Sequence, residues 1–107
     1  MSSQDDSDRI FKALSDRRRR AMLDALKDEP KTTGTLVALF PEIDRCTVMQ
    51  HIRVLEAAGL IVARKDGRER WNHLNALPIK DIHDRWIGDY ARNAAGLMSR
   101  LEKELDA

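Results

Sequence analysis

One stretch of the chain, from Arg45 to Ile61, carries the side chains best suited to hydrogen-bond with another molecule. Val48, Ile52 and Leu55 follow one another at spacings of four and three, which places them on one face of a helix. The remaining faces carry the long or polar side chains Arg45, Thr47, Met49, Gln50 and Arg53. Arginine and glutamine can hydrogen-bond base edges, and arginine also pairs with phosphates. This pattern is typical of a helix that buries one face and presents the other to DNA.

Signals for both ends of this helix lie beside the run. Asp44 can accept hydrogen bonds from the first turn, Ile43 can pack against that turn, and Gly59 can end the helix in a left-handed conformation. A short amphipathic helix precedes it, with apolar residues Leu36, Leu39 and Phe40. Pro41-Glu42 breaks that helix and leaves a tight turn. The sequence therefore predicts a helix-turn-helix over residues 32–59.

Beyond Gly59 the pattern changes from helical to extended. Residues 60–63 are apolar, and Asp66-Gly67 within Lys65–Arg68 is a β-hairpin signal. Residues 70–74 can return as a second strand. We therefore expect a hairpin wing over residues 60–75, with Lys65, Arg68 and Arg70 making it basic.

The chain resembles the ArsR/SmtB family of winged-helix repressors over nearly everything after residue 7. Three segments carry the resemblance: FKALSDRRRRAMLDAL is similar to the opening helix pair, TVMQHIRVLEAAGLI to the recognition helix, and KDGRERWNHLN to the wing and its return strand. The turn at residues 40–44 looks one residue longer than is usual in the family. The resemblance implies a mainly α fold with a small β-hairpin wing, in the order α-α-α-α-β-β-α. The expected DNA-binding residues are Arg45, Thr47, Met49, Gln50, His51, Arg53, Lys65, Arg68 and Arg70.

With 107 residues, the chain is expected to form a single winged-helix domain, residues 1–107. Residues 1–7 are polar and are expected to form a flexible tail before a short helix capped near Ser7 or Asp8. Asp16 is expected to cap the second helix, which Pro30 would end. The apolar positions of that second helix are Met22, Leu23 and Leu26.

The C-terminal third predicts one long helix over residues 78–105, beginning at a proline that suits a first turn. Its apolar stripe, at steps of three or four, comprises Ile79, Ile82, Trp86, Tyr90, Ala94, Leu97, Leu101 and Leu105. This stripe is longer than so small a domain can cover, so we expect homodimerisation, as the family resemblance implies. The alternative is a monomer in which the helix folds back. The expected dimer-interface residues are Ile10, Phe11, Leu14, Ile82, Trp86, Tyr90, Leu97 and Leu101.

Charge is distributed unevenly along the chain. The formal net charge is only +1, but residues 45–77 hold six basic and three acidic side chains, whereas the segments on either side each sum to −1. The positive excess therefore falls on the predicted recognition helix and wing. Arg17–Arg20 could touch the DNA backbone, but a solvated helix face is the preferred interpretation, because nearby aspartates can offset it.

Metal sensing is the obvious function that the family resemblance implies, and it requires ligands at one of the family's known sites. The Cys-x-Cys pair of one site has no counterpart in Thr32–Val37. Asp81 and His83 match half of a second site on the C-terminal helix, but Ala94 and Leu97 stand where its other ligands would be. Because zinc prefers four ligands, we expect no metal site and no cofactor.

Three further residues leave two interpretations open. His51 could contact a phosphate or support its helix. His73, in the return strand, is favoured as structural. Cys46, near a helix N-terminus, could be redox-reactive or merely small enough to fit against DNA, and the second is favoured because the chain has no other cysteine.

We find no catalytic motif, and we expect no enzyme activity. The chain also has no membrane-spanning run or signal-peptide pattern, so we expect a cytoplasmic protein without membrane partners. The expected function is a homodimeric repressor that binds double-stranded DNA at an inverted-repeat operator. The sequence identifies no small-molecule effector. The rival hypothesis is a winged-helix module for protein interaction or dimerisation, with an idle DNA face.

Overall fold

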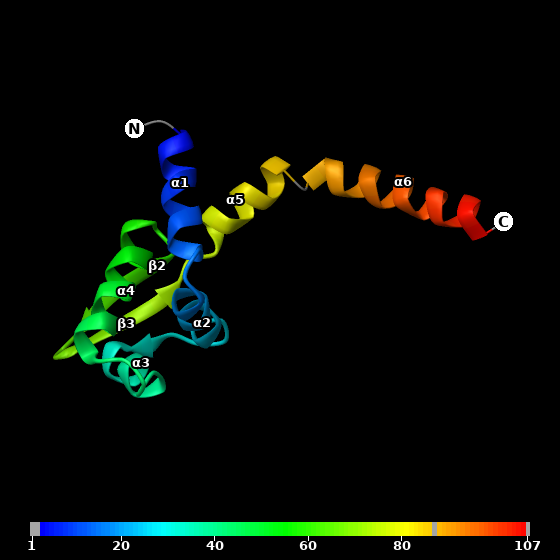
Figure 1. The fold of residues 1–107 in the computed structure, drawn as a ribbon. Helices are drawn as coiled ribbons and strands as arrows, with labels where there is room; N and C mark the ends of the chain where they lie inside the picture. Colours follow the sequence, from blue (N-terminus) through cyan, green and yellow to red (C-terminus); the bar gives the residue numbers. More distant parts are fainter. Residues whose placement is uncertain (1–2, 87, 107) are drawn as a thin grey trace.

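The computed structural model describes residues 3–86 and 88–106, with the side chains of residues 3, 86 and 88–92 outside the description (Figure 1). The elements follow the order α1 (Ser3–Leu14), α2 (Arg17–Ala25), β1 (Lys31–Thr32), α3 (Thr33–Leu39), α4 (Arg45–Ala57), β2 (Ile61–Asp66), β3 (Glu69–Leu74), α5 (Leu77–Trp86) and α6 (Gly88–Asp106). The predicted mainly helical fold with a hairpin wing is confirmed.

The β-hairpin wing belongs to a three-stranded antiparallel sheet in the order β1-β3-β2. The hairpin β2–β3 pairs Ile61 with Leu74 at its base and Asp66 with Glu69 at its tip. Its two loop residues are Gly67 and Arg68, and Gly67 has a φ of +63°, which glycine adopts without strain. Strand β1, whose two residues pair with β3, is not among the elements that the sequence predicts.

The core lies where α1 to α4 meet the base of the hairpin. Its fully buried apolar side chains include those of Met22, Leu36, Val48, Ile52, Leu55 and Leu60. The predicted inward faces of α2 and α4 are therefore confirmed. The predicted N-cap of α2 is also confirmed, because the Asp16 side chain accepts a hydrogen bond from the Arg18 N–H. That helix ends at Ala25, before Pro30.

The expected flexible tail over residues 1–7 is wrong for the residues described, because α1 begins at Ser3. Asp5 and Asp6 occupy its first turn. Negative side chains there interact favourably with the positive end of the helix dipole, which accounts for the earlier start. The cap signal at Ser7 and Asp8 lies inside the helix.

The C-terminal third consists of two helices, not the single helix expected over residues 78–105. Gly88 begins α6, and its low helix propensity favours a helix boundary at this residue. Figure 1 shows α6 extending away from the other elements. The radius of gyration is 18.2 Å, compared with about 13 Å for a compact domain of this length. The α6 helix therefore does not fold back onto its own domain.

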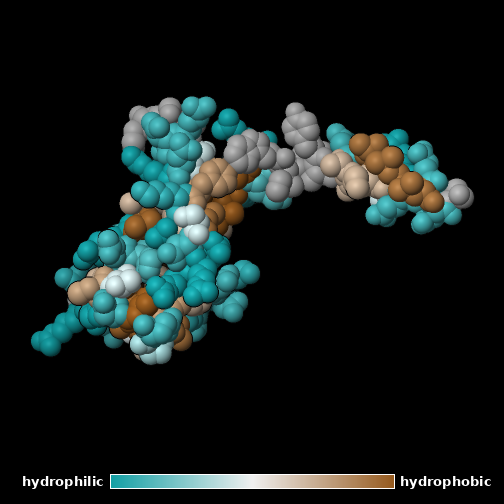
Figure 2. All heavy atoms as spheres, in the orientation of Figure 1, coloured by the Kyte–Doolittle hydropathy of each residue, from teal (hydrophilic) through white to brown (hydrophobic). Residues whose placement is uncertain are grey.

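The outer surface of α6 carries a band of apolar side chains, which Figure 2 shows as a hydrophobic stripe among hydrophilic neighbours. Leu97, Met98, Leu101 and Leu105 are between 42% and 84% exposed. None of the described helices is both long enough and apolar enough to cross a membrane.

Candidate nucleic-acid interface

Helix α4 is held at both ends by defined caps. The Thr47 N–H donates to Oδ1 of Asp44 at 2.7 Å. At the other end, the Leu60 N–H donates to the Leu55 carbonyl and the Gly59 N–H to the Glu56 carbonyl, each at 2.9 Å, with Gly59 at a φ of +77°. These two bonds form a Schellman motif. Both predicted ends of the helix are confirmed.

The N-terminal cap also affects the charge of Asp44. Hydrogen bonds from the backbone and then from the side chain of Thr47 lower the pKa of the Asp44 carboxyl from its ordinary value of 3.8. Asp44 is therefore ionised at neutral pH, and its negative charge lies at the positive end of the α4 dipole. The cap fixes the position where the exposed face of α4 begins.

The outer face of α4 contains most of the side chains expected to contact DNA. Val48, Ile52 and Leu55 are buried against the core, which turns Arg45, Gln50 and Arg53 toward solvent. Thr47 and Met49 are half-buried at the edge of this face. Cys46 is exposed on the first turn. The exposed side chains of Arg45, Gln50 and Arg53 therefore provide two guanidinium groups and one amide that can form hydrogen bonds.

His51 was expected among the DNA-contacting residues, with a supporting role as the alternative. Its ring is half-buried, and its Nδ1 lies 3.3 Å from Nη1 of Arg19 in α2. Its Nε2 is buried and has no hydrogen-bond partner among the described residues. The structure therefore places His51 behind the exposed face, in a position that supports the helix.

The tip of the wing presents exposed basic side chains at the end of the hairpin. Lys65 and Arg68 are exposed, as is Arg64, which the sequence analysis did not single out. Figure 1 shows the wing tip and the first turn of α4 at the same end of the domain, and Figure 2 shows hydrophilic side chains projecting from that corner. Alternation along β2 could have identified Arg64, because buried Ile61 and half-buried Ala63 point the other way.

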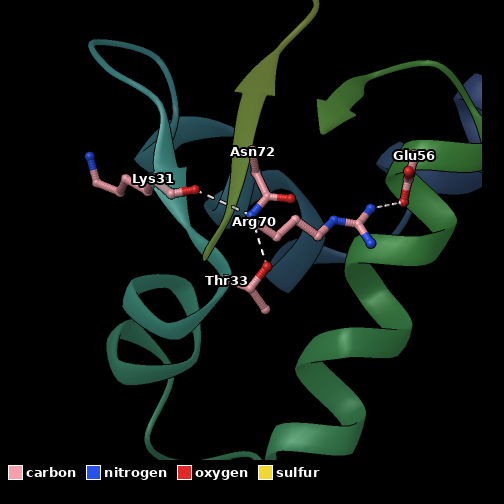
Figure 3. Close-up of polar contacts among 5 residues, drawn as sticks. All are labelled: Lys31, Thr33, Glu56, Arg70 and Asn72. Carbon is pink, nitrogen blue, oxygen red and sulfur yellow. Dashed lines mark hydrogen bonds and ion pairs between the residues drawn. The ribbon is translucent and has the colours of Figure 1, made fainter. Parts of the chain in front are cut away.

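Arg70 was also expected to contact DNA, but it already has an acidic partner. Its Nη2 forms an ion pair with Oε2 of Glu56 in the last turn of α4 (Figure 3). The two side chains are 38% and 40% exposed. This pair ties β3 to α4, so Arg70 fixes the wing relative to the helix.

A second contact ties the wing to the first helix of the helix-turn-helix. Asn72 of β3 is fully buried, and its Nδ2 donates to the Lys31 carbonyl at 3.2 Å and to Thr33 Oγ1 at 3.1 Å (Figure 3). His73, the neighbouring strand residue, is half-buried. Because Thr33 begins α3, this contact sets the position of α3 against the sheet.

The expected dimer-interface residues are found in three different environments. Ile10 is a core residue, only 7% exposed, because α1 uses this position to pack on its own domain. The same packing half-buries Leu14 and Ile82. Phe11, Leu97 and Leu101 are exposed. Trp86 and Tyr90 lie outside the residues whose side chains the structure describes.

The half-site considered for metal lies on α5. His83 Nδ1 is 3.5 Å from Oδ1 of Asp84, and Lys80 Nζ bonds Oδ2 of the same carboxylate at 2.7 Å. Asp81 is exposed beside them. Among the residues whose side chains the structure describes, no three His, Cys, Asp or Glu side chains form a group that could hold a metal ion.

Comparisons with known proteins agree with this geometry. A family model described as a helix-turn-helix domain matches residues 14–64. The chain is 35% identical over 86 residues to the uncharacterized HTH-type transcriptional regulator YuzN of Bacillus subtilis (strain 168), covering 75% of this chain and 94% of that relative.

Two solved structures share the fold. The crystal structure of the ArsR family transcriptional regulator RHA00566 has a TM-score of 0.74 at 29% identity, covering 88% of this chain and 95% of that one. The homodimeric winged helix-turn-helix domain Mb0332 from Mycobacterium bovis has a TM-score of 0.63 at 21% identity, covering 99% and 92%. The capped helix, the hairpin wing and these similarities lead to one conclusion: the chain belongs to the ArsR family of winged helix-turn-helix transcriptional regulators.

Proposed function

We propose that this protein is a homodimeric repressor that reads a specific operator with α4 and contacts the DNA backbone with its wing. The observation that carries the proposal is the exposed face of α4. The side chains of Arg45, Gln50 and Arg53 are exposed on that face, and both ends of the helix are capped. A rigid helix with such side chains fits the major groove.

The proposed contacts divide into two kinds. On α4, Gln50 can bond a base edge, and Arg45 and Arg53 can bond bases or phosphates, with Thr47 and Met49 at the margin. On the wing, Lys65 and Arg68 are placed to contact phosphates. His51 and Arg70 act indirectly, because each already has a partner within the domain.

The proposed dimer accounts for the apolar stripe on α6. Leu97, Leu101 and Leu105 are exposed in the single chain, and such a contiguous apolar surface is typical of an interaction site. A second copy, related by a two-fold axis, would cover it and add a second recognition helix. The homodimeric state of the structural neighbour Mb0332 supports this arrangement. A dimer bound across an operator represses by excluding the transcription machinery.

We further propose that DNA binding does not depend on a metal ion. The support is the ligand set of α5, because Asp81 and His83 belong to no group of three ligand side chains among the described residues, and zinc prefers four ligands. Any signal that relieves repression would then act through another chemistry.

The experiment that tests this function is selection of genomic DNA fragments bound by the purified protein, with and without added metals, followed by footprinting. We expect an imperfect inverted repeat whose half-sites are centred about 34 Å apart, one turn of B-DNA. Recovery of no enriched sequence would favour the protein-interaction module instead.

A further inference from the structure

Arg19 makes polar contacts with two other helices from the first turn of α2. Its Nε donates to the Ala13 carbonyl at 2.7 Å, and its Nη2 donates to the Lys12 carbonyl at 2.9 Å. Its Nη1 lies 3.3 Å from Nδ1 of His51 in α4. One guanidinium therefore joins the carboxyl end of α1 to the recognition helix.

The contact with α1 is chemically specific. The last carbonyls of a helix lack partners within the helix, and a positive charge near them is stabilised by the helix dipole. Arg20 makes a related contact, since its Nη1 donates to the Leu14 carbonyl at 2.6 Å. Both arginines thus bond the end of α1, and Arg19 in addition contacts His51 of α4.

The contact with His51 determines where the ring carries its proton. A guanidinium can only donate hydrogen bonds, so Nδ1 of His51 must accept, and the proton of the neutral ring lies on Nε2. A proton on Nδ1 would point at the cation and break the contact. Since the guanidinium fork is planar and rigid, its three donors fix the relative positions of α1 and α4.

We propose that Arg19 is a positioning residue that couples α1 to the DNA-reading helix. The α1 helix packs against both α4 and α5, so Arg19 can transmit a displacement of either α1 or α5 to α4. The proposal rests on the proposed function, because it assigns to Arg19 the regulation of that same DNA-binding face.

The test compares Arg19→Ala with Arg20→Ala in the full chain. Arg19→Ala removes one positive charge and two hydrogen bonds to the end of α1, and Arg20→Ala removes one positive charge and one such bond, so Arg20→Ala controls for the lost charge and for a weakened contact with α1. We expect Arg19→Ala to bind the selected operator about tenfold more weakly than Arg20→Ala, the factor expected for one lost hydrogen bond to a charged group. Affinity for unrelated DNA should fall equally in the two variants. Equal losses on the operator would overturn the proposal.

The second measurement is the nitrogen chemical shifts of the His51 ring, which report the tautomer without any DNA. In the wild-type protein we expect Nδ1 to be unprotonated and Nε2 protonated, with these signals changed in Arg19→Ala and unchanged in Arg20→Ala. A protonated Nδ1 in the wild-type ring would overturn the proposal even if Arg19→Ala fails to fold. If the wild-type protein binds no operator, the proposed function fails, while the ring signals still show whether Arg19 holds His51.

Discussion

The side chain of Asn72 donates to the hydroxyl of Thr33 across 3.1 Å of a buried site, and so joins the wing strand β3 to the first residue of α3. The same Nδ2 bonds the carbonyl of Lys31 in β1. These contacts connect β3 with β1 and α3, two consecutive elements whose bonded residues lie 41 and 39 positions away from Asn72 in the sequence. The Asn72 amide therefore helps to fix α3 against the wing, beside the Arg70–Glu56 pair that joins the wing to α4.

Replacing Asn72 with alanine is expected to lower the free energy of unfolding by about 1–3 kcal/mol, because the buried carbonyl and hydroxyl lose their donor. Chemical denaturation measures this change. Asn93→Ala, on the exposed surface of α6, is the control and should change stability by less than about 0.5 kcal/mol. A similarly small effect at Asn72 would show that the buried amide does not hold the elements together.

The cap of α4 predicts an acid-dependent part of the stability. Because hydrogen bonds to Thr47 lower the pKa of Asp44 in the folded state, its stabilisation is fully present above the ordinary value of 3.8. It is lost as the pH falls from 3.8 through the lower folded-state pKa.

Unfolding of Asp44→Asn across this pH range measures the effect. Asparagine still caps but does not titrate, so the wild-type advantage over this variant should shrink as the pH falls below 3.8. Asp44→Ala should be less stable than Asp44→Asn throughout. Parallel pH curves for the wild type and Asp44→Asn would contradict the assignment.

Base reading and backbone contact can be separated with one residue from each surface. Gln50→Ala should change base preference and cost about 1–3 kcal/mol on the preferred operator. Arg68→Ala should weaken binding to all sequences alike and reduce the salt slope by about one per subunit. Affinities measured on the operator and on a scrambled duplex distinguish the two. Uniform losses in both variants would mean that α4 is not the base-reading helix.

Zinc, cadmium and arsenite at low micromolar concentrations are expected to leave the dimer and its DNA binding unchanged. The reason is that Asp81 and His83 are two ligands on one helix, and Ala94 and Leu97 stand where further ligands would be needed. Calorimetry on the wild type checks this expectation. A stoichiometric zinc site that releases DNA and vanishes in His83→Ala would establish metal sensing.

The α4 helix could be predicted from the sequence because its signals are local. Val48, Ile52 and Leu55 fix the buried face by spacing alone, and Asp44 and Gly59 mark the two ends within a few residues. The hairpin could also be predicted from local signals, which are Gly67 and the extended segments on either side of it. The candidate DNA-binding surface follows directly from these elements, since the unburied faces carry the polar residues.

The remaining features depend on contacts between distant residues. β1 has only two residues and is defined by pairing with β3, which no local pattern reveals. Arg19 lies in a basic run that is typical of a solvated surface, and only the turn between α1 and α2 brings it to His51. The role of Ile10 as a core residue likewise depends on how α1 packs, not on its spacing.

The central claim is sequence-specific DNA binding, and the salt dependence of affinity for the selected operator tests it most directly. Neutralising several phosphates should make the logarithm of affinity fall with the logarithm of salt concentration by about 0.9 per contact, because counterions are released. The operator should remain preferred over a scrambled duplex of the same length at every salt concentration. A flat salt response with equal affinity for both duplexes would contradict the account.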